Sequence, residues 1–520
     1  MSQGEKRLYI FSIFIIVLMS VLFCVKKHGL FTDEIYTYGL ANSYFAPYIA
    51  DIYGGNLIDK IVVSKDLFNY ITVGFDERFS FDSVFYNQGF DTLPPLYYCL
   101  IHFICSFFPE TFTKWFGLSI NLLLYTACLV ILFKLSYKVF EDYYSSIIVM
   151  IFYGLSTLGM STMLMIRMYI LLTFLTTMLA YFSIKLIENR KIKYCTIVLL
   201  VHYLGMMTHY YYGVYAFFLF LICIYHLIKI RQYRFIGLYV LFNVLGGILF
   251  LVTFPAFLNQ LIAPKLVSGY TAYSNLFMLS SYTNILNYFL IYFFQTLSMQ
   301  VFTALLIILC CLKKKKTLIA DKVKCYYNIV VIPAIFALIV VSVISPIIAE
   351  RYIYNLVPIL CLFIAREIKI AHLTEGLLFR FRYKSVLIIL CINIILLLFN
   401  PPAFLYPQMP KINKMLKMYS DYPCVFFDNN YSSPVTENLI QLMLFNSFIV
   451  VNDVNSKFMR EYIQENQKNE KVILYVDKNR FFSSGYDSKE ILANIMQTSE
   501  YKSYEYLYSN YSVDVYVLNK

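Results

Sequence analysis

Residues 31–38 read Phe-Thr-Asp-Glu-Ile-Tyr-Thr-Tyr, and the interpretation of the whole chain depends on them. The adjacent carboxylates of Asp33 and Glu34 follow directly after the first hydrophobic segment, residues 9–25. Acids this close to lipid are costly unless they are paired or functional. Asp33 therefore either caps the short helix that follows, since Asp accepts bonds from helix N–H groups, or carries chemistry at the membrane surface.

The composition identifies an integral membrane protein. The chain has 520 residues, of which 60% are hydrophobic and only 14% charged, whereas soluble domains carry about 25% charged residues. The net charge of +12 does not indicate nucleic acid, because the positive residues fall in short loops between apolar segments. Most of the 12 cysteines lie in those segments, and Cys424 alone lies in the polar C-terminal part, where it has no partner for a bridge.

The apolar segments predict a mainly α, polytopic transmembrane bundle of about eleven spans. Residues 9–25 lack a small-residue cleavage site and are interpreted as a retained first span. The apolar run 96–108 is too short to cross, because about 20 residues are needed, and it is predicted to be a helix in the interface, like 34–46. The remaining predicted spans are 115–135, 145–164, 169–187, 195–210, 212–229, 236–254, 284–312, 326–346, 352–368 and 385–400.

The distribution of basic residues predicts the orientation in the cell membrane. Lys6 and Arg7 place the start of the first span in the cytoplasm, so the acidic pair emerges outside. With 96–108 as a non-crossing helix, the basic clusters fall in cytoplasmic turns. The short external turns then carry only Arg167, Lys265 and Arg351.

The composition changes after the two prolines at 401–402. Residues 412–520 are polar and alternate strand-like with helix-like runs, which predicts a small extracytoplasmic α/β domain. Its predicted strands are Cys424–Asp428, Phe448–Val451, Val472–Asp477 and Val513–Leu518, and its predicted helices are 434–445, 455–466 and 488–498. The predicted domains are thus 1–405, with 26–112 as an external loop carrying two juxtamembrane helices, and 412–520.

Five unusual features fall on the predicted outer face. They are Asp33-Glu34, D-T-L-P-P-L-Y-Y at 91–98, R-M-Y at 167–169, T-H-Y-Y-Y-G at 208–213, and E-R-Y at 350–352 with Pro358 beyond. Each has a purely structural interpretation: the prolines start a helix, the arginines reach the interface or pair with acids, and the His209–Tyr212 aromatics form an interfacial belt. Their combination is more specific, because Arg matches phosphate oxygens and a carboxylate takes a proton from an attacking hydroxyl.

In this order the five features resemble the GT-C superfamily of polytopic glycosyltransferases, nearest the branch that holds protein O-mannosyltransferases and the aminoarabinose transferases of lipid A. The resemblance spans residues 31–360. It implies a bacterial cell-envelope enzyme in the plasma membrane. The implied donor is a sugar on a polyprenyl phosphate, and the implied acceptor is a hydroxyl of a glycan, lipid or protein. Transfer is implied to proceed with inversion on the external face, with membrane lipids as the other partners and no nucleic acid.

The resemblance also implies roles for individual residues. Asp33 and Glu34 would be the catalytic residues, with Asp33, the first acid of the pair, as the base, and Arg351, Arg167 and Lys265 would hold the donor phosphate. Substrate contacts are expected from Asp91, Tyr97, His209, Tyr210 and Tyr352. Relatives often have a basic residue before the two prolines of the second motif, where this chain has Leu93. Some relatives need a divalent cation and others do not, so a role for Mg²⁺ or Mn²⁺ at Asp33 or Asp91 stays open.

Two other functions fit a protein of this kind. A flippase or transporter for a lipid-linked sugar would show paired repeats and broken helices near mid-membrane, and the sequence shows neither. A polysaccharide polymerase or ligase would use a lipid-diphosphate donor and a large external loop, whereas the large loop here comes first. The alternatives differ in whether the donor is cleaved and in which phosphorylated lipid is released.

Overall fold

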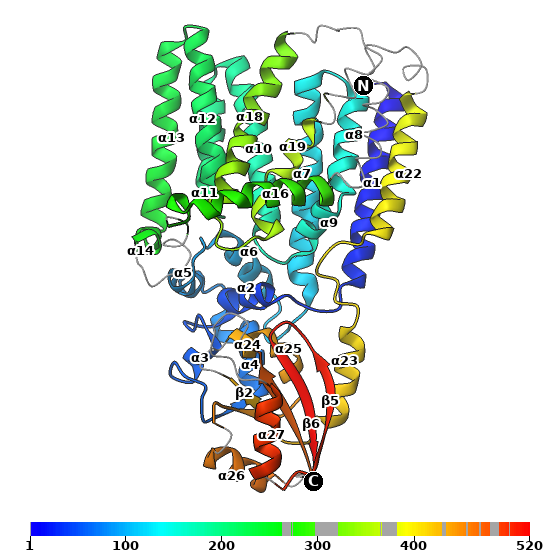
Figure 1. Ribbon diagram of the computed structural model, residues 1–520. Helices are drawn as coiled ribbons and strands as arrows, with labels where there is room; N and C mark the ends of the chain where they lie inside the picture. The colour runs from blue at the N-terminus through cyan, green and yellow to red at the C-terminus, as the bar shows by residue number, and fades with distance from the viewer. Residues whose placement is uncertain are drawn as a thin grey trace. The chain divides into compact units, whose positions relative to one another are not determined.

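The computed structural model describes residues 2–262, 272, 274–296, 321–363, 366, 382–428, 433–453, 456–466, 470–478, 488–498 and 500–520. The chain divides into two compact units. Figure 1 labels their helices and strands. The first unit comprises Met1–Lys26, Asp91–Tyr97 and Gly117–Leu405, and the second comprises Lys27–Phe90, Tyr98–Phe116 and Tyr406–Lys520.

The first unit is helical. Its described helices are α1 (Gln3–Lys26), α7 (Lys114–Phe140), α8 (Tyr143–Gly154), α9 (Thr157–Leu164), α10 (Tyr169–Asn189), α11 (Ile192–Met206), α12 (Tyr211–Lys229), α13 (Tyr233–Thr253), α14 (Ala256–Ile262), α16 (Asn284–Thr296), α18 (Asp321–Ile344), α19 (Val357–Leu360) and α22 (Arg382–Phe399), with 3-10 turns η2 (Leu279–Thr283) and η3 (Glu350–Ile353).

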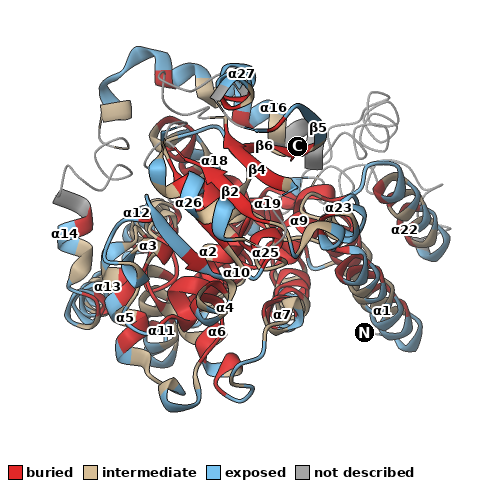
Figure 2. Cartoon of the chain, turned by 90° about the horizontal axis from the view of Figure 1, so that it is seen from below, coloured by how far each residue is buried: buried red, intermediate tan, exposed pale blue. Residues whose placement is uncertain are grey.

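Six helices among the described residues, α1, α7, α10, α12, α13 and α18, are long and apolar enough to cross a membrane, and the bent pair α8–α9 makes seven. Their outer faces present large apolar side chains, as Figure 2 shows in pale blue along α1 and α13. Leu123 on α7 and Val252 on α13 are 70% and 74% exposed. Such surface is costly in water and suits contact with lipid, so the chain is a multi-pass membrane protein.

The described helices agree with the predicted spans in part. The predicted span 145–164 is broken by 59° between α8 and α9, because Ser156 caps a new helix by accepting the Gly159 N–H at 2.9 Å. The prediction of a continuous helix over 352–368 is wrong for the described start of that segment. It consists of η3 and the four-residue α19, where Pro358 in the first turn cannot donate to a preceding carbonyl.

Three further comparisons concern length. α11 and the apolar part of α22 are shorter than the helices that are long enough to cross a membrane. Most of the predicted span 284–312 lies outside the described residues. The larger number of about eleven spans therefore stays a prediction. α6 (Leu96–Cys105) has 10 residues, too few to cross a bilayer, as the sequence predicts for the run 96–108.

The second unit is built around a six-stranded sheet in the order β1-β3-β2-β4-β6-β5. β2 (Cys424–Phe427) runs parallel to β3 (Ser447–Val451) and to β4 (Lys471–Asp477), and the other neighbours are antiparallel. Figure 2 shows the central strands buried. The remaining elements are β1 (Lys60–Val63), β5 (Ser503–Ser509), β6 (Val513–Asn519), α2 (Thr32–Asn42), α3 (Ile49–Ile52), α4 (Ser64–Ile71), η1 (Phe75–Glu77), α5 (Phe81–Phe90), α6, α23 (Met409–Leu416), η4 (Lys417–Tyr419), α24 (Ser433–Glu437), α25 (Leu439–Leu442), α26 (Lys457–Glu465) and α27 (Ser488–Thr498).

The four predicted strands correspond to β2, β3, β4 and β6, and the predicted helices 455–466 and 488–498 to α26 and α27. The predicted helix 434–445 is two short helices, α24 and α25. β1 was not predicted. It lies in the loop 26–112 and pairs with β3 from Lys60 opposite Val450 to Val63 opposite Ser447. Most of that loop thus packs into the same unit as residues 406–520.

Candidate active site

Asp33 is the second residue of α2 in the second unit and is half-buried. The helix begins after Phe31, whose N–H donates to the Glu34 carboxylate at 2.6 Å. The residue that makes this capping bond is therefore Glu34, and not Asp33, which the sequence offers as a capping candidate. Asp33 lies in the first turn of α2, at the positive end of the helix dipole.

Glu34 is also half of a buried ion pair. Its carboxylate lies 2.9 Å from the Lys27 ammonium, and both side chains are fully buried. The Lys27 nitrogen lies 5.6 Å from the ring centroid of Tyr406, and the Lys27 carbonyl accepts a hydrogen bond from the Lys114 ammonium. Glu34 thus ties the start of the preceding loop to the first turn of α2, which fixes the backbone that carries Asp33.

In the first unit, the motif at 91–97 contacts the segment that contains His209. The Leu96 N–H donates to the Met207 carbonyl at 3.0 Å. Gln260 bridges the two segments, because its amide donates to the Asp91 carbonyl at 2.6 Å and its oxygen accepts the Tyr210 hydroxyl. Burial, and secondly the Asp91 carboxylate, raise the pKa of Tyr210, which therefore stays a protonated donor at neutral pH.

Tyr97 is linked through Asn121 to the backbone just before Arg167. Its buried hydroxyl donates to the Asn121 oxygen at 2.6 Å. The Asn121 amide donates in turn to the carbonyls of Met163 and Met165, at 2.9 and 2.7 Å. These carbonyls lie just before Arg167, at the end of α9, where a helix leaves C=O groups unpaired. Asn121 therefore completes a polar link that the sequence pattern did not reveal.

Arg167 and His209 are both buried, at 8% and 4% exposure. The His209 ring lies 5.7 Å from the Tyr169 ring and 4.8 Å from the Tyr211 ring, and its Nδ1 accepts the Tyr211 N–H at 3.0 Å. Burial, reinforced by the Arg167 charge, lowers the pKa of His209 to about 3. The imidazole is therefore neutral at physiological pH, and Arg167 supplies the positive charge.

Arg351 reaches the same cluster from η3. Its guanidinium carbon lies 5.4 Å from the Tyr352 ring centroid, and that ring lies 5.5 Å from Tyr211. Tyr354 connects the segment 350–354 to Tyr169: its ring lies 5.9 Å from the Tyr169 ring, and its hydroxyl donates to Glu350 at 3.2 Å. The three motifs at 166–169, 208–213 and 350–354 thus share one aromatic cluster with two guanidinium groups.

The predicted site residues accordingly fall into two sets. The first unit brings together Arg167, His209, Tyr210, Tyr352 and Arg351, with Asp91 and Tyr97 in hydrogen bonds to their neighbours. Asp33 and Glu34 lie in the second unit, and Lys265 lies outside the described residues. Within the described ranges, His, Cys, Asp and Glu side chains form no group of three or more that could hold a metal ion, so Asp33 and Asp91 belong to no such group.

Sequence reasoning missed Lys27, Asn121, Gln260 and Tyr406. A lysine after an apolar segment normally reads as a flanking charge, and a lone Asn or Gln in a helix carries no periodic signal. The presence of Glu34 seven residues after Lys27 was the one available hint of a pair. The others depend on contacts between residues far apart in the sequence.

The depressed pKa of His209 predicts a pH-dependent stability. Since the unfolded imidazole titrates near 6.5, the unfolded state binds a proton that the native state does not between that pH and the native pKa of about 3. The free energy of unfolding should fall as pH falls through this window, by up to about 2 kcal/mol between pH 7 and pH 5. Thermal unfolding of wild type and His209→Gln at both pH values checks this. Equal pH dependence of the two proteins would contradict it.

The two units combine a polytopic helical bundle with a mixed-sheet domain that an early loop of the chain helps to build. Two solved structures share this architecture. A crystal structure of ArnT from Cupriavidus metallidurans bound to undecaprenyl phosphate is 9% identical, covers 99% of this chain and 98% of that chain, and has a TM-score of 0.53. The apo form is 10% identical, covers 97% of each chain and has a TM-score of 0.52.

No protein-family model and no curated protein matches the chain. The likeness to ArnT, a GT-C aminoarabinose transferase, therefore rests on structure and concerns the fold. The resemblance predicted from the five sequence features is confirmed at that level.

Proposed function

We propose that this protein is an inverting glycosyltransferase that moves a sugar from a polyprenyl-phosphate donor to a hydroxyl of a cell-envelope acceptor on the external membrane face. The observation that carries the proposal is the largely buried cluster in which tilted and edge-to-face aromatic rings connect Arg167 with Arg351. It occurs in a chain with the fold of ArnT, a structure of which holds undecaprenyl phosphate. Two guanidinium groups at low exposure suit a lipid phosphate, which needs charge compensation away from water.

The arginines act on the leaving group. When the bond between the anomeric carbon and the phosphate oxygen breaks, the lipid phosphate gains a full negative charge. Arg351 and Arg167 stabilise that charge more strongly than the ground-state phosphodiester, which lowers the barrier. Neutral His209 adds bulk without extra charge, and the hydroxyls of Tyr210 and Tyr352 offer hydrogen bonds to the phosphate or the sugar. Lys265 is a further candidate phosphate ligand.

Asp33 acts on the acceptor. Its carboxylate takes the proton from the acceptor hydroxyl as that oxygen attacks the anomeric carbon from the face opposite the phosphate. One C–O bond forms, one breaks, and the configuration inverts. Glu34, held in its pair with Lys27, positions Asp33. The proposal includes the predicted roles of Asp91 and Tyr97 near the substrate, about eleven spans, and an external active site.

The test is donor cleavage by the purified protein in lipid nanodiscs, with radiolabelled polyprenyl-phosphate sugars and membrane extracts as acceptors. Transfer of label to an acceptor, with polyprenyl monophosphate identified by mass spectrometry, supports the proposal. A lipid that changes leaflet with its sugar still attached indicates a flippase. A released lipid diphosphate indicates the polymerase or ligase alternative. Either outcome would overturn the proposal.

Replacing Arg351 by alanine should lower kcat/KM for the donor by about 100-fold, because one charged donor to the leaving phosphate is lost. Arg351→Lys should recover part of the loss, since it restores the charge without the planar fork. The control is Arg234→Ala, an exposed arginine in the first turn of α13. Donor kinetics that are equal in Arg351→Ala and Arg234→Ala would exclude Arg351 from the phosphate site.

A further inference from the structure

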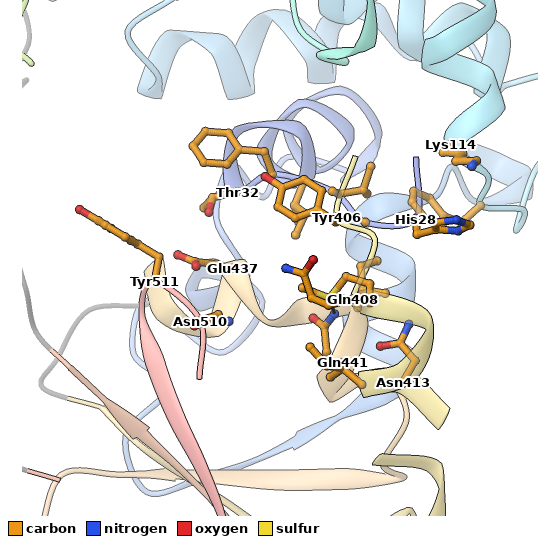
Figure 3. Close-up of a pocket in the computed structure, with 18 of the residues that line it drawn as sticks. His28, Thr32, Lys114, Tyr406, Gln408, Asn413, Glu437, Gln441, Asn510 and Tyr511 are labelled. Atoms are coloured by element: carbon orange, nitrogen blue, oxygen red, sulfur yellow. Dashed lines mark hydrogen bonds between the residues drawn. The ribbon is translucent and has the colours of Figure 1, made fainter. Parts of the chain in front are cut away.

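The second unit contains a pocket of about 400 Å³ beside the start of α2. Its walls come from the loop before α2, the segment 112–114, the helices α23 and α25, the end of α24 and the turn between β5 and β6. Figure 3 shows Gln408, Gln441 and Asn413 gathered on one side of it and Glu437, Asn510 and Tyr511 on the other. A pocket with several convergent polar groups is a binding-site candidate.

Two amide side chains in this pocket have unused hydrogen-bonding capacity. The Asn413 oxygen is buried and has no hydrogen-bond partner among the described residues. Gln441 is only 7% exposed, and its amide nitrogen donates to the Met409 sulfur at 3.2 Å. A thioether is a weak acceptor, so this amide exchanges it readily for a hydroxyl oxygen. Buried polar groups are normally satisfied, which indicates that a ligand completes these two.

The charge of the lining argues against a phosphorylated ligand. Among the described residues, no arginine lines the pocket. The Lys114 ammonium already donates to the Lys27 carbonyl. On the opposite wall, the Glu437 carboxylate accepts hydrogen bonds from Ser512 and Thr32, and it would repel an anion. Amides and a carboxylate together suit uncharged hydroxyl groups, because the amides donate and accept hydrogen bonds and the carboxylate accepts them.

Aromatic rings complete the lining. Tyr406 and Tyr511 line the pocket, with Tyr406 near the amides and Tyr511 at the edge, as Figure 3 shows. The C–H faces of a sugar ring are apolar while its edge carries hydroxyls, so aromatic surface with amides and a carboxylate matches both parts. Thr32, which also lines the pocket, directly precedes Asp33.

We infer that this pocket binds an uncharged sugar residue of the acceptor and places one of its hydroxyls at the turn that carries Asp33. The inference rests on the proposed function and narrows its acceptor to a neutral glycan. Asn413 and Gln441 are the specificity residues: one sugar hydroxyl donates to the Asn413 oxygen, and another accepts from the Gln441 amide in place of the Met409 thioether.

The experiment is saturation-transfer NMR on the full-length protein in nanodiscs, with methyl glycosides of neutral hexoses and N-acetylhexosamines as probes and a phosphorylated glucose as the anionic comparison. Wild type should bind at least one neutral probe and prefer it to the phosphorylated sugar. Gln441→Leu and Asn413→Ala should each weaken binding roughly ten-fold. Gln464→Leu, at an exposed position of α26, should not. If Gln441→Leu unfolds, Asn413→Ala at its half-buried site provides the test.

Three outcomes would overturn the inference: no neutral probe bound, unchanged binding in both variants, or preference for the phosphorylated sugar. In a transfer assay the two variants should raise the acceptor KM about ten-fold and leave the donor KM unchanged. The binding measurement needs no turnover, so it tests the sugar-binding pocket independently of the proposed glycosyltransferase function. Neutral-sugar binding without any donor cleavage would refute the proposed function and leave the pocket assignment in place.

Discussion

Asp33→Asn is expected to reduce sugar transfer by about 100- to 10,000-fold while the protein still folds and binds donor. The amide has the size of the carboxylate but accepts no proton, so the attacking hydroxyl must react without a base. Asp33 is half-buried and Glu34 makes the capping bond to Phe31, so the change removes charge without removing that bond. Single-turnover transfer with saturating donor measures the effect on chemistry.

The matched control is Asp76→Asn, which makes the same change at an exposed position of η1 in the same unit. Its transfer rate should equal that of wild type. Donor binding, followed separately with a fluorescent polyprenyl phosphate, should be equal in all three proteins. An Asp33→Asn protein that turns over at a near-normal rate would remove Asp33 from the role of base.

Breaking the ion pair between Lys27 and Glu34 should have the largest effect on stability. Glu34→Gln leaves an ammonium group buried without its counter-charge, and losing one member of a buried pair typically costs about 3–5 kcal/mol. Both side chains are fully buried, so solvent cannot compensate. The thermal midpoint in detergent should fall by roughly 10 °C relative to wild type.

The double variant Lys27→Met/Glu34→Leu distinguishes two roles of Glu34: holding Asp33 in position, and taking part in the reaction itself. It removes both charges, so most of the stability lost in Glu34→Gln should return. If Glu34 only positions Asp33, transfer should recover with stability. Recovered stability with abolished transfer would instead indicate that the Glu34 carboxylate takes part in the reaction alongside Asp33. If the double variant is as unstable as Glu34→Gln, the unpaired charge of Lys27 is not the cause of the lost stability.

The parts of the fold that local patterns encode were predictable. Long apolar runs predicted the helices α7, α10 and α13, and short continuous apolar runs predicted β2 and β4, whose residues are almost all buried. Elements with weak local signals were not predictable. β1 reads Lys-Ile-Val-Val within a polar loop, and it becomes a strand only because β3 offers an unpaired edge.

For the candidate site, the sequence by itself determined which chemical groups are present: an acidic pair after the first span, two arginines between apolar segments, and tyrosines around His209. These follow from residue type and from distance to the membrane, which the chain encodes locally. Tertiary structure alone decided that Glu34 is half of a buried pair with Lys27, and that Arg167 and Arg351 belong to one cluster of aromatic rings. It also decided that Asn413 and Gln441 share a pocket. The physical reason is that pairing, burial and cavity formation depend on side chains from distant segments, and no local pattern specifies which of them will meet.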